Sequence, residues 1–230
     1  MDLRILSGGA ANGLVDAVRE AFRERSGMDV SGDFGAVGGM QDRVMGGEAV
    51  DLVILTRKAI EDLAAAGRVD AGSITDLGEV VTGIAVREGA PVPNVSDGDA
   101  LRETFRAASA LYGPDTQKAT AGIHFARVLG QLGLGDEVRG RMREFPNGQT
   151  AMAEMARSGD PDPVGCTQVT EILNTPGVAY AGPLPAPYDL STVYTAAVAT
   201  DAASPDAARA LITLLAAPER AEVRRKAGFS

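Results

Sequence analysis

The chain opens with Met1-Asp-Leu-Arg-Ile-Leu-Ser-Gly-Gly-Ala-Ala-Asn-Gly13, the stretch that decides the fold. Leu3, Ile5 and Leu6 form the apolar pattern of a strand, which runs directly into small residues, and a helix pattern follows. The first N–H groups of a helix have no partner within that helix. A strand that ends in small residues at a helix start therefore offers unpaired N–H groups, and glycine allows close approach to them.

The composition excludes several classes of protein. With 230 residues, the chain is long enough for one large domain or two small lobes. Its net charge of −9, without a local basic stripe, excludes nucleic acid and anionic membranes as partners. The single cysteine, Cys166, and the single histidine, His124, exclude an internal disulfide and a zinc cluster. We therefore expect no metal and no cofactor, and no run is long enough for membrane insertion.

Strand and helix patterns alternate along the chain. The expected strands are residues 3–7, 29–35, 50–55, 78–87, 110–112, 164–167, 178–181 and 190–200. The expected helices are residues 13–26, 40–46, 57–66, 99–107, 123–132, 136–143, 148–158, 204–217 and 218–226. This alternation predicts an α/β fold with two Rossmann-like lobes joined by two hinge strands. We expect a discontinuous first lobe, residues 1–82 and 194–230, and a second lobe, residues 83–193.

The ends of the expected strands share a composition of small and polar residues. Ligands of open α/β sheets lie beyond the carboxyl ends of the strands. In this chain those ends are residues 7–10, 35–39, 116–122, 147–149 and 167–169. These five turns are the expected ligand-binding segments, and tight turns or helix caps are the alternative interpretation of each.

Five stretches carry a resemblance through their order and spacing. They are Leu6-Ser-Gly-Gly-Ala10, Phe34-Gly-Ala-Val-Gly-Gly39, Val50-Asp-Leu-Val-Ile-Leu55, Thr120-Ala-Gly-Ile123 and Gly165-Cys-Thr-Gln168. Over nearly its whole length the chain resembles the type II periplasmic binding proteins, in the branch that includes molybdate- and tungstate-binding proteins. The resemblance implies a small anion held between two lobes that close by hinge motion. It also implies ligand contacts from Ser7, Gly8, Val37, Gly38, Ala121, Gly148 and Gln168.

Two departures from the family pattern favour an organic carboxylate over molybdate. Relatives that bind tetrahedral oxyanions usually carry a serine after the second strand, whereas residues 36–39 have no hydroxyl group. Gln168 also stands where a tyrosine is often found. Amide, hydroxyl and ammonium donors spread over a larger area suit an extended carboxylate. The remaining expected ligand-binding residues are Gly9, Lys118, Thr120, Gln149 and Thr167.

The sequence leaves more than one function open. The first is a binding protein for a small anionic ligand. The same branch resembles aconitate isomerase, which implies a cytosolic isomerase of a small polycarboxylate as the alternative, with its catalytic residues unknown. A cytosolic sensor that docks a partner is the third. No export signal precedes Leu3, which predicts a cytoplasmic protein. A trimmed leader would instead make it periplasmic, with an ABC permease as partner.

Overall fold

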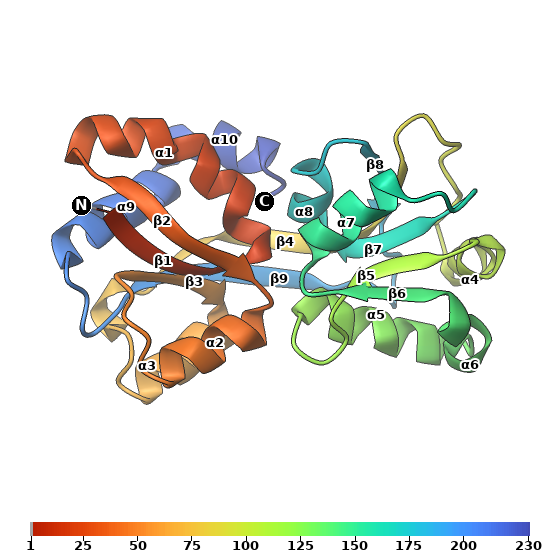
Figure 1. Cartoon of the computed structure of the whole chain (residues 1–230), viewed down its shortest axis with the longest axis horizontal. Coiled ribbons are helices and arrows are strands. Elements are labelled where there is room, and N and C mark those ends of the chain that lie inside the picture. The colour runs from red at the N-terminus through yellow and green to blue at the C-terminus, as the bar shows by residue number, and fades with distance from the viewer. Residues whose placement is uncertain (1) are drawn as a thin grey trace. The chain divides into compact units, whose positions relative to one another are not determined.

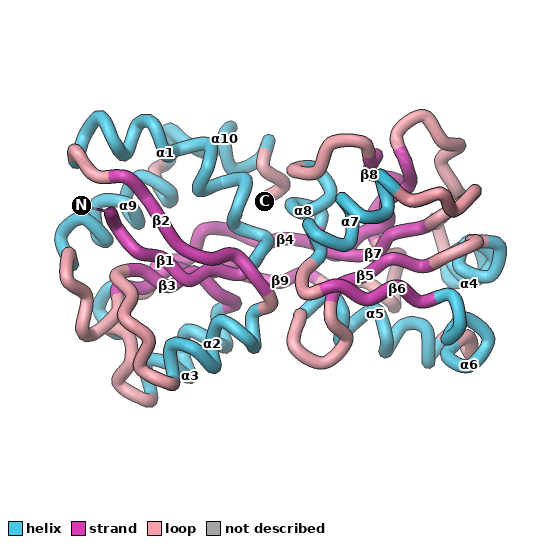
Figure 2. The backbone as a smooth tube through the Cα atoms, viewed as in Figure 1, coloured by secondary structure: helices cyan, strands magenta, loops and turns pink. Residues whose placement is uncertain are grey.

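The computed structural model describes residues 2–230, which form two compact units (Figures 1 and 2). Unit 1 extends to Val80 and resumes from Thr192 to Ser230, and unit 2 covers Val81–Ser191. The chain thus leaves unit 1 within strand β4 (Thr75–Arg87) and returns at strand β9 (Ser191–Val198). None of the helices in the described chain is long and apolar enough to cross a bilayer.

Unit 1 is built on a mostly parallel sheet with the strand order β2-β1-β3-β9. The parallel strands are β1 (Asp2–Gly8), β2 (Asp29–Gly35) and β3 (Leu52–Thr56). In register, Ser7 lies opposite Phe34 on one side and Ile54 on the other. The carboxyl ends of the three strands therefore share one edge. Strand β9 is antiparallel, and its pairing of Tyr194 with Thr56 brings Tyr194 to the same edge.

Helices cover both faces of the unit 1 sheet (Figure 1). One face carries α1 (Asn12–Ser26), α9 (Pro205–Ala216) and α10 (Ala221–Lys226), with the turns η1 (Gly9–Ala11) and η4 (Pro218–Arg220). The other carries α2 (Val37–Met45) and α3 (Arg57–Ala65), and η2 (Ala71–Ser73) precedes β4. Helix α1 shows why these segments are helical, because Leu14, Val18 and Phe22 recur at helical spacing and are all buried.

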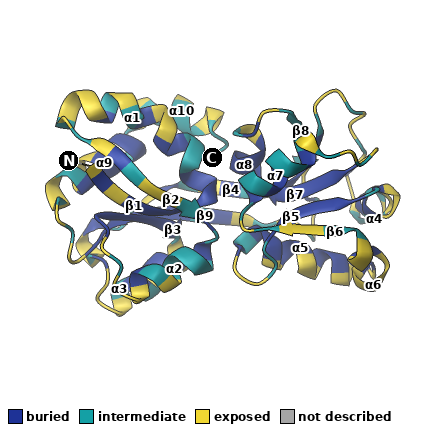
Figure 3. Cartoon of the chain, viewed as in Figure 1, coloured by how far each residue is buried: buried dark blue, intermediate teal, exposed yellow. Residues whose placement is uncertain are grey.

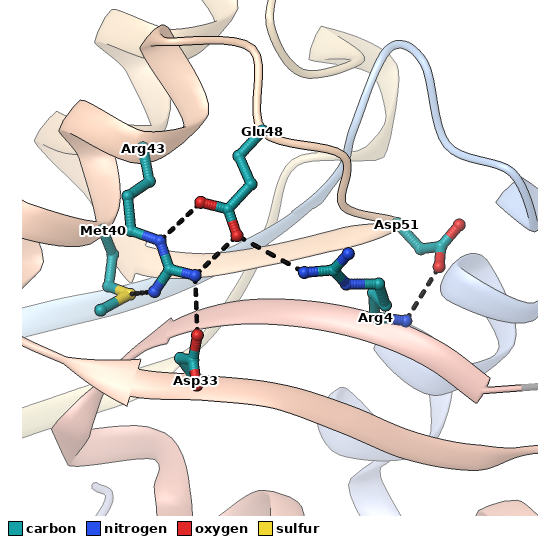
Figure 4. Close-up of polar contacts among 6 residues, drawn as sticks. All are labelled: Arg4, Asp33, Met40, Arg43, Glu48 and Asp51. Carbon is teal, nitrogen blue, oxygen red and sulfur yellow. Dashed lines mark hydrogen bonds and ion pairs between the residues drawn. The ribbon is translucent and has the colours of Figure 1, made fainter.

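Ion pairs orient helix α2 on its sheet (Figure 4). The Arg43 guanidinium donates to Asp33 Oδ2 on β2 at 2.7 Å and to Glu48 Oε2 before β3 at 2.7 Å. Glu48 also meets Arg4 of β1 at 3.5 Å. Arg43 is 32% exposed, so each pair contributes about 1 kcal/mol or less. The two contacts of the Arg43 guanidinium also fix the orientation of α2, because they hold the helix at one angle to β2. They thereby fix the position of the first turn of α2.

Unit 2 repeats this arrangement with the strand order β4-β7-β5-β6, and β8 pairs with β4. Its strands are β5 (Leu111–Pro114), β6 (Met142–Phe145), β7 (Val164–Gln168) and β8 (Val178–Pro183). Strand β5 is parallel to both β6 and β7, so these three strands end at one edge. Strand β4 runs antiparallel to β7 and pairs Thr82 with Gln168, which places Thr82 at that edge too.

Two hydrophobic clusters lie on the two faces of the unit 2 sheet. Ile84 belongs to the cluster beneath α4 (Gly98–Ala107), α5 (Thr120–Gln131) and α6 (Gly135–Val138). Its neighbour Ala85 belongs to the cluster beneath α7 (Gly148–Arg157) and α8 (Val169–Leu173). This alternation follows from the period of two along a strand. In the first cluster the rings of Phe105 and Phe125 lie 5.3 Å apart. The expected two-lobed α/β class is confirmed.

One expected helix is wrong. Residues 136–143 were expected to be helical, but the segment contains the short α6, the turn η3 (Arg139–Arg141) and the start of strand β6. Strand β6 is the edge of its sheet, and Figure 3 shows it largely exposed. Its middle residues, Arg143 and Glu144, are charged and exposed, which protects an edge from pairing with other chains. An edge strand of this kind lacks the alternation that identifies a strand in sequence.

Two helices begin three residues earlier than expected. Helix α2 starts at Val37 rather than at residue 40, and α5 starts at Thr120 rather than at residue 123. Both first turns are rich in glycine and alanine, so they lack the apolar periodicity that marks a helix. The expected ligand-binding residues at these positions therefore lie within first helical turns and not in loops.

Candidate functional site

The carboxyl edge of the unit 1 sheet gathers the five ligand-binding residues expected there. They are Ser7, Gly8, Gly9, Val37 and Gly38. Ser7 is fully buried, and its hydroxyl donates to the Gly8 carbonyl at 2.9 Å. A Cβ atom at Gly8 would lie 2.9 Å from Tyr194 Cε1 and 3.3 Å from Val37 Cγ2. Glycine thus allows the end of β1 to lie against both side chains.

The start of α2 has no side-chain cap. The residue before the helix, Ala36, is extended and has no side-chain oxygen to accept from the first turn. Helices usually begin with a serine, threonine, aspartate or asparagine that satisfies one of these N–H groups. The first turn, which contains Val37 and Gly38, is therefore suited to an external acceptor such as an anion.

The carboxyl edge of the unit 2 sheet gathers the other expected residues. They are Lys118, Thr120, Ala121, Gly148, Gln149, Thr167 and Gln168. Helix α5 also begins without a side-chain cap, because Ala119 precedes it. The turn before it is fixed by Asp115, whose Oδ1 accepts from the backbone N–H groups of Gln117 at 2.7 Å and Lys118 at 2.9 Å. Uncapped starts thus occur in both units.

Gln168 and Thr82 carry buried polar atoms that have no protein partner. Gln168 is 2% exposed, and neither its Oε1 nor its Nε2 has a hydrogen-bond partner among the described residues. The hydroxyl of Thr82, its cross-strand neighbour, is likewise buried and unpartnered. Buried polar atoms are nearly always paired, so each such atom requires an explanation. A bound molecule with both donors and acceptors would satisfy this pair.

Glu171 is the centre of a buried group of hydrogen bonds in unit 2. Its side chain is 5% exposed and reaches back from α8 toward β7 and α7. Thr167 Oγ1 donates to Glu171 Oε2 at 2.5 Å, and the Gly148 N–H donates to Oε1 at 3.2 Å. The backbone N–H groups of Gln149 and Gln168 also donate to this carboxylate. One carboxylate therefore joins the start of α7 to the end of β7.

Helix α7 differs from α2 and α5 because its first turn is already satisfied. Gly148 and Gln149 donate to Glu171, and the Thr150 N–H donates to Asn147 Oδ1 at 2.8 Å. Sequence reasoning assigned Gly148 and Gln149 to the ligand, but in the structure their N–H groups have an acceptor from the protein. Thr167, assigned in the same way, directs its hydroxyl to the same carboxylate.

Burial raises the pKa of Glu171 above its ordinary value. The same shift is opposed by hydrogen bonds from Thr167 and from the backbone of Gly148, Gln149 and Gln168, which favour the ionised form. The desolvation of the carboxyl group is the larger effect. Glu171 therefore holds its proton to a higher pH than an exposed glutamate does.

Three residues of these edges were not assigned to the site from sequence. In sequence, Glu171 has the position of a first-turn acid that favours the helix dipole, with a general-base role as the alternative. Tyr194 was interpreted as hinge or core packing, and Thr82 as one residue of a long strand. The register of β4 with β7 and of β9 with β3 brings Thr82 and Tyr194 to the edges. Such pairing between distant segments leaves no local signal in sequence.

Two reactive residue types take structural positions. Cys166 is buried in β7, and burial raises the pKa of its thiol, which makes it a poor nucleophile. His124 is buried in α5 with its Nε2 atom 2.7 Å from the Tyr188 carbonyl oxygen. Across residues 2–230, no group of three or more histidine, cysteine, aspartate or glutamate side chains is placed to hold a metal ion.

Replacing Gly148 by alanine tests the contact that Glu171 makes. A Cβ atom there would lie 1.9 Å from Thr167 Oγ1 and 2.1 Å from Glu171 Oε2, so the carboxylate must move. We expect Gly148→Ala to lower the free energy of unfolding by about 3 kcal/mol, measured by urea denaturation. Gly130 of α5 is the matched control, since a Cβ atom there meets nothing within 4 Å. Gly130→Ala should be stabilising by about 0.5–1 kcal/mol. Equal effects of the two substitutions would show that the close contact of Gly148 with Glu171 and Thr167 does not require glycine.

The raised pKa of Glu171 predicts a pH-dependent stability. The folded chain binds the Glu171 proton more tightly than the unfolded chain does, so this proton stabilises the fold at low pH. This stabilisation is complete at pH values below the ordinary pKa of 4.5. It is lost as the pH rises through the higher pKa that Glu171 has in the folded state. Urea denaturation should therefore show that wild type loses stability relative to Glu171→Gln over this window. Glu144→Gln, at an exposed carboxylate, is the control variant. If the difference in unfolding free energy between wild type and Glu171→Gln does not change with pH, the pKa of Glu171 is not raised.

Comparison with known proteins identifies relatives along the whole chain. The family model described as "Bacterial extracellular solute-binding protein" matches residues 3–230. A curated relative, the aconitate isomerase of a Pseudomonas species, is 29% identical over 235 residues, which cover 99% of this chain and 87% of that protein. Both matches extend through unit 1 and unit 2 alike.

Solved structures agree on the fold. The periplasmic molybdate-binding protein of Azotobacter vinelandii superposes with a TM-score of 0.80 at 18% identity, covering 100% of this chain and 99% of that one. The sulfate-binding protein of Mycobacterium tuberculosis H37Rv gives a TM-score of 0.75 at 20% identity, covering 100% and 86%. The expected resemblance to type II periplasmic binding proteins of the molybdate-binding branch is confirmed. With a family match from residue 3 to the last residue, this chain belongs to the bacterial extracellular solute-binding proteins.

Proposed function

We propose that the protein binds a small organic polycarboxylate, with backbone N–H groups and neutral side chains of each unit as donors. In unit 1 the donors are the first turn of α2 and the backbone at the end of β1, where Ser7 and Gly8 lie. In unit 2 they are the first turn of α5, which contains Ala121, together with the side chain of Gln168. The unpartnered amide of Gln168 is the observation that carries the proposal.

The chemistry of that amide favours an organic ligand. A fully ionised oxyanion such as sulfate only accepts hydrogen bonds, so it satisfies the Nε2 atom of Gln168 and leaves Oε1 facing a negative charge. A polycarboxylate with a protonated carboxyl group also supplies a donor for Oε1. The unpartnered hydroxyl of Thr82 adds one more group that both donates and accepts. Leaving these buried atoms unpaired would cost about 1–3 kcal/mol each.

Neutral donors also suit the charge of the chain. The net charge is −9, so the overall field does not draw anions in and the ligand must be held by local donors. Lys118, which lies before α5 and is exposed, is the cation of the expected set. An ABC permease is the proposed partner if the chain is exported. The location of this chain in the cell stays a prediction.

A panel of anions tests the proposal. We expect cis-aconitate, trans-aconitate and tricarballylate to raise the thermal midpoint in a concentration-dependent way, and sulfate and molybdate to raise it less. A ligand at about 100 times its Kd adds about 2.7 kcal/mol of stability, which corresponds to a shift of roughly 5–10 °C for a chain of this size.

A pair of substitutions locates the response. Gln168→Met should remove most of the shift caused by carboxylates, because it removes both polar atoms and keeps the volume of the side chain. Gln131→Met, at an exposed position in the last turn of α5, should leave the shift unchanged. The proposal is wrong if no carboxylate shifts the midpoint or if both variants respond like wild type.

The similarity to aconitate isomerase favours a second function, isomerisation of a small polycarboxylate. In that reaction a base removes a proton from a methylene carbon beside a carboxylate, the double bond shifts by one position, and a proton returns to the former vinyl carbon. The reaction requires a base and donors for the developing enediolate. The first turn of α5 and the Gln168 amide are donors of the required kind.

Proton exchange separates the isomerase from the binding protein. If the protein is an isomerase, trans-aconitate in deuterated buffer should convert to the cis isomer and take up solvent deuterium at carbon, both followed by proton NMR. Gln168→Met should slow both processes, whereas Gln131→Met should not. Binding of aconitate without interconversion and without deuterium uptake would leave the binding function and exclude the enzyme.

A further inference from the structure

We propose that Glu171 determines the specificity of unit 2, because its carboxyl group occupies the start of α7 and so excludes compact, fully ionised oxyanions from this edge. The inference rests on the proposed function and assigns one residue the choice between two classes of anion. Three observations carry it: the contacts of Glu171, the absence of a side chain at Gly148, and the unpartnered amide of Gln168.

The first step is that Glu171 takes the place of a ligand at α7. The N-terminus of a helix attracts anions through its unpaired N–H groups and its dipole. At α7 those N–H groups, from Gly148 and Gln149, already donate to the Glu171 carboxylate. Asn147 accepts from the next one, that of Thr150. An external oxyanion can therefore use the α7 amides only by displacing Glu171.

The second step is that the chain is shaped for this internal carboxylate. Any side chain at position 148 would overlap both Glu171 Oε2 and Thr167 Oγ1, so glycine is required for the contact. Thr167 directs its hydroxyl to the carboxylate at 2.5 Å and not away from it. The contact is thus made by three residues on β7, α7 and α8, and it does not arise from one mobile side chain.

The third step is electrostatic. The Thr167 hydroxyl and the Gly148 N–H already donate to Glu171, so a compact oxyanion at this edge meets an acceptor instead of donors, and an ionised Glu171 would in addition repel it. A compact dianion has no neutral part, so any oxygen atom that it places near Glu171 carries negative charge. An extended polycarboxylate can place a neutral carboxyl group or a methylene group nearest Glu171 and direct its charges toward α5. Gln168 follows Thr167 directly and offers both a donor and an acceptor to such a ligand.

Replacing the carboxyl group tests the inference. We expect Glu171→Gln, which keeps the size and the accepting oxygen, to lower the Kd for sulfate relative to that for trans-aconitate by about tenfold or more. Both constants are measured by isothermal titration calorimetry at neutral pH. Glu144→Gln is the matched control, because Glu144 Oε2 also accepts from a threonine hydroxyl, that of Thr116 at 2.9 Å, and from its N–H at 3.2 Å. Glu144 is exposed, so its replacement should leave the ratio unchanged.

The outcomes separate this inference from the proposed function. If wild type binds trans-aconitate and Glu171→Gln gains nothing for sulfate, or gains equally for both anions, Glu171 does not set specificity although the proposed function stands. If wild type binds no carboxylate, the proposed function fails, and a gain for sulfate in Glu171→Gln alone still supports the exclusion.

A measurement on wild type covers the case in which Glu171→Gln does not fold. Under this inference, trans-aconitate shifts the backbone amide resonance of Ala121 in α5, while that of Gly148 stays near its free position. A Gly148 resonance that moves as far as that of Ala121 would mean that the ligand reaches the α7 amides, and would overturn the inference.

Discussion

The hydrogen bonds that the buried Glu171 carboxylate accepts are the constraint on which the unit 2 edge depends. Thr167 and Gly148 both donate to it, so the end of β7 and the start of α7 cannot move independently. The side-chain amide of Gln168, the next residue after Thr167, has no partner among residues 2–230. The candidate site is thus described as much by the donors that already have a partner as by those that do not.

Unit 1 reaches a comparable edge by different means. The first turn of α2 contains no acidic residue and has no side-chain cap. At the other end of this helix, Arg43 binds Asp33 and Glu48, and these contacts fix the direction of the helix. Gly8 then allows Tyr194 and Val37 to lie against the end of β1. Both units therefore bring strand ends and helix starts to one edge. In unit 1 no side chain caps the first N–H groups of α2, whereas in unit 2 those of α7 donate to Glu171.

Most of the fold was predictable because it follows local patterns. Strand β1, helix α1 and helix α3 carry their signals in consecutive residues, and they appear where expected. Strand β6 was missed because an exposed edge needs no apolar alternation. The contacts of Glu171 were missed for a different reason. Its partners lie in segments that only the folded sheet brings together, and a first-turn acid in sequence does not reveal which helix it serves.

The interrupted course of unit 1 has a consequence for how the protein is made. Strand β9 and helices α9 and α10 follow the whole of unit 2 in the chain, so the ribosome completes unit 2 before the last pieces of unit 1 emerge. Domains generally fold as units during synthesis. During that interval β3 lacks its antiparallel neighbour, and its open side is a place where the nascent chain can pair wrongly. Unit 2, which is continuous, is under no such delay.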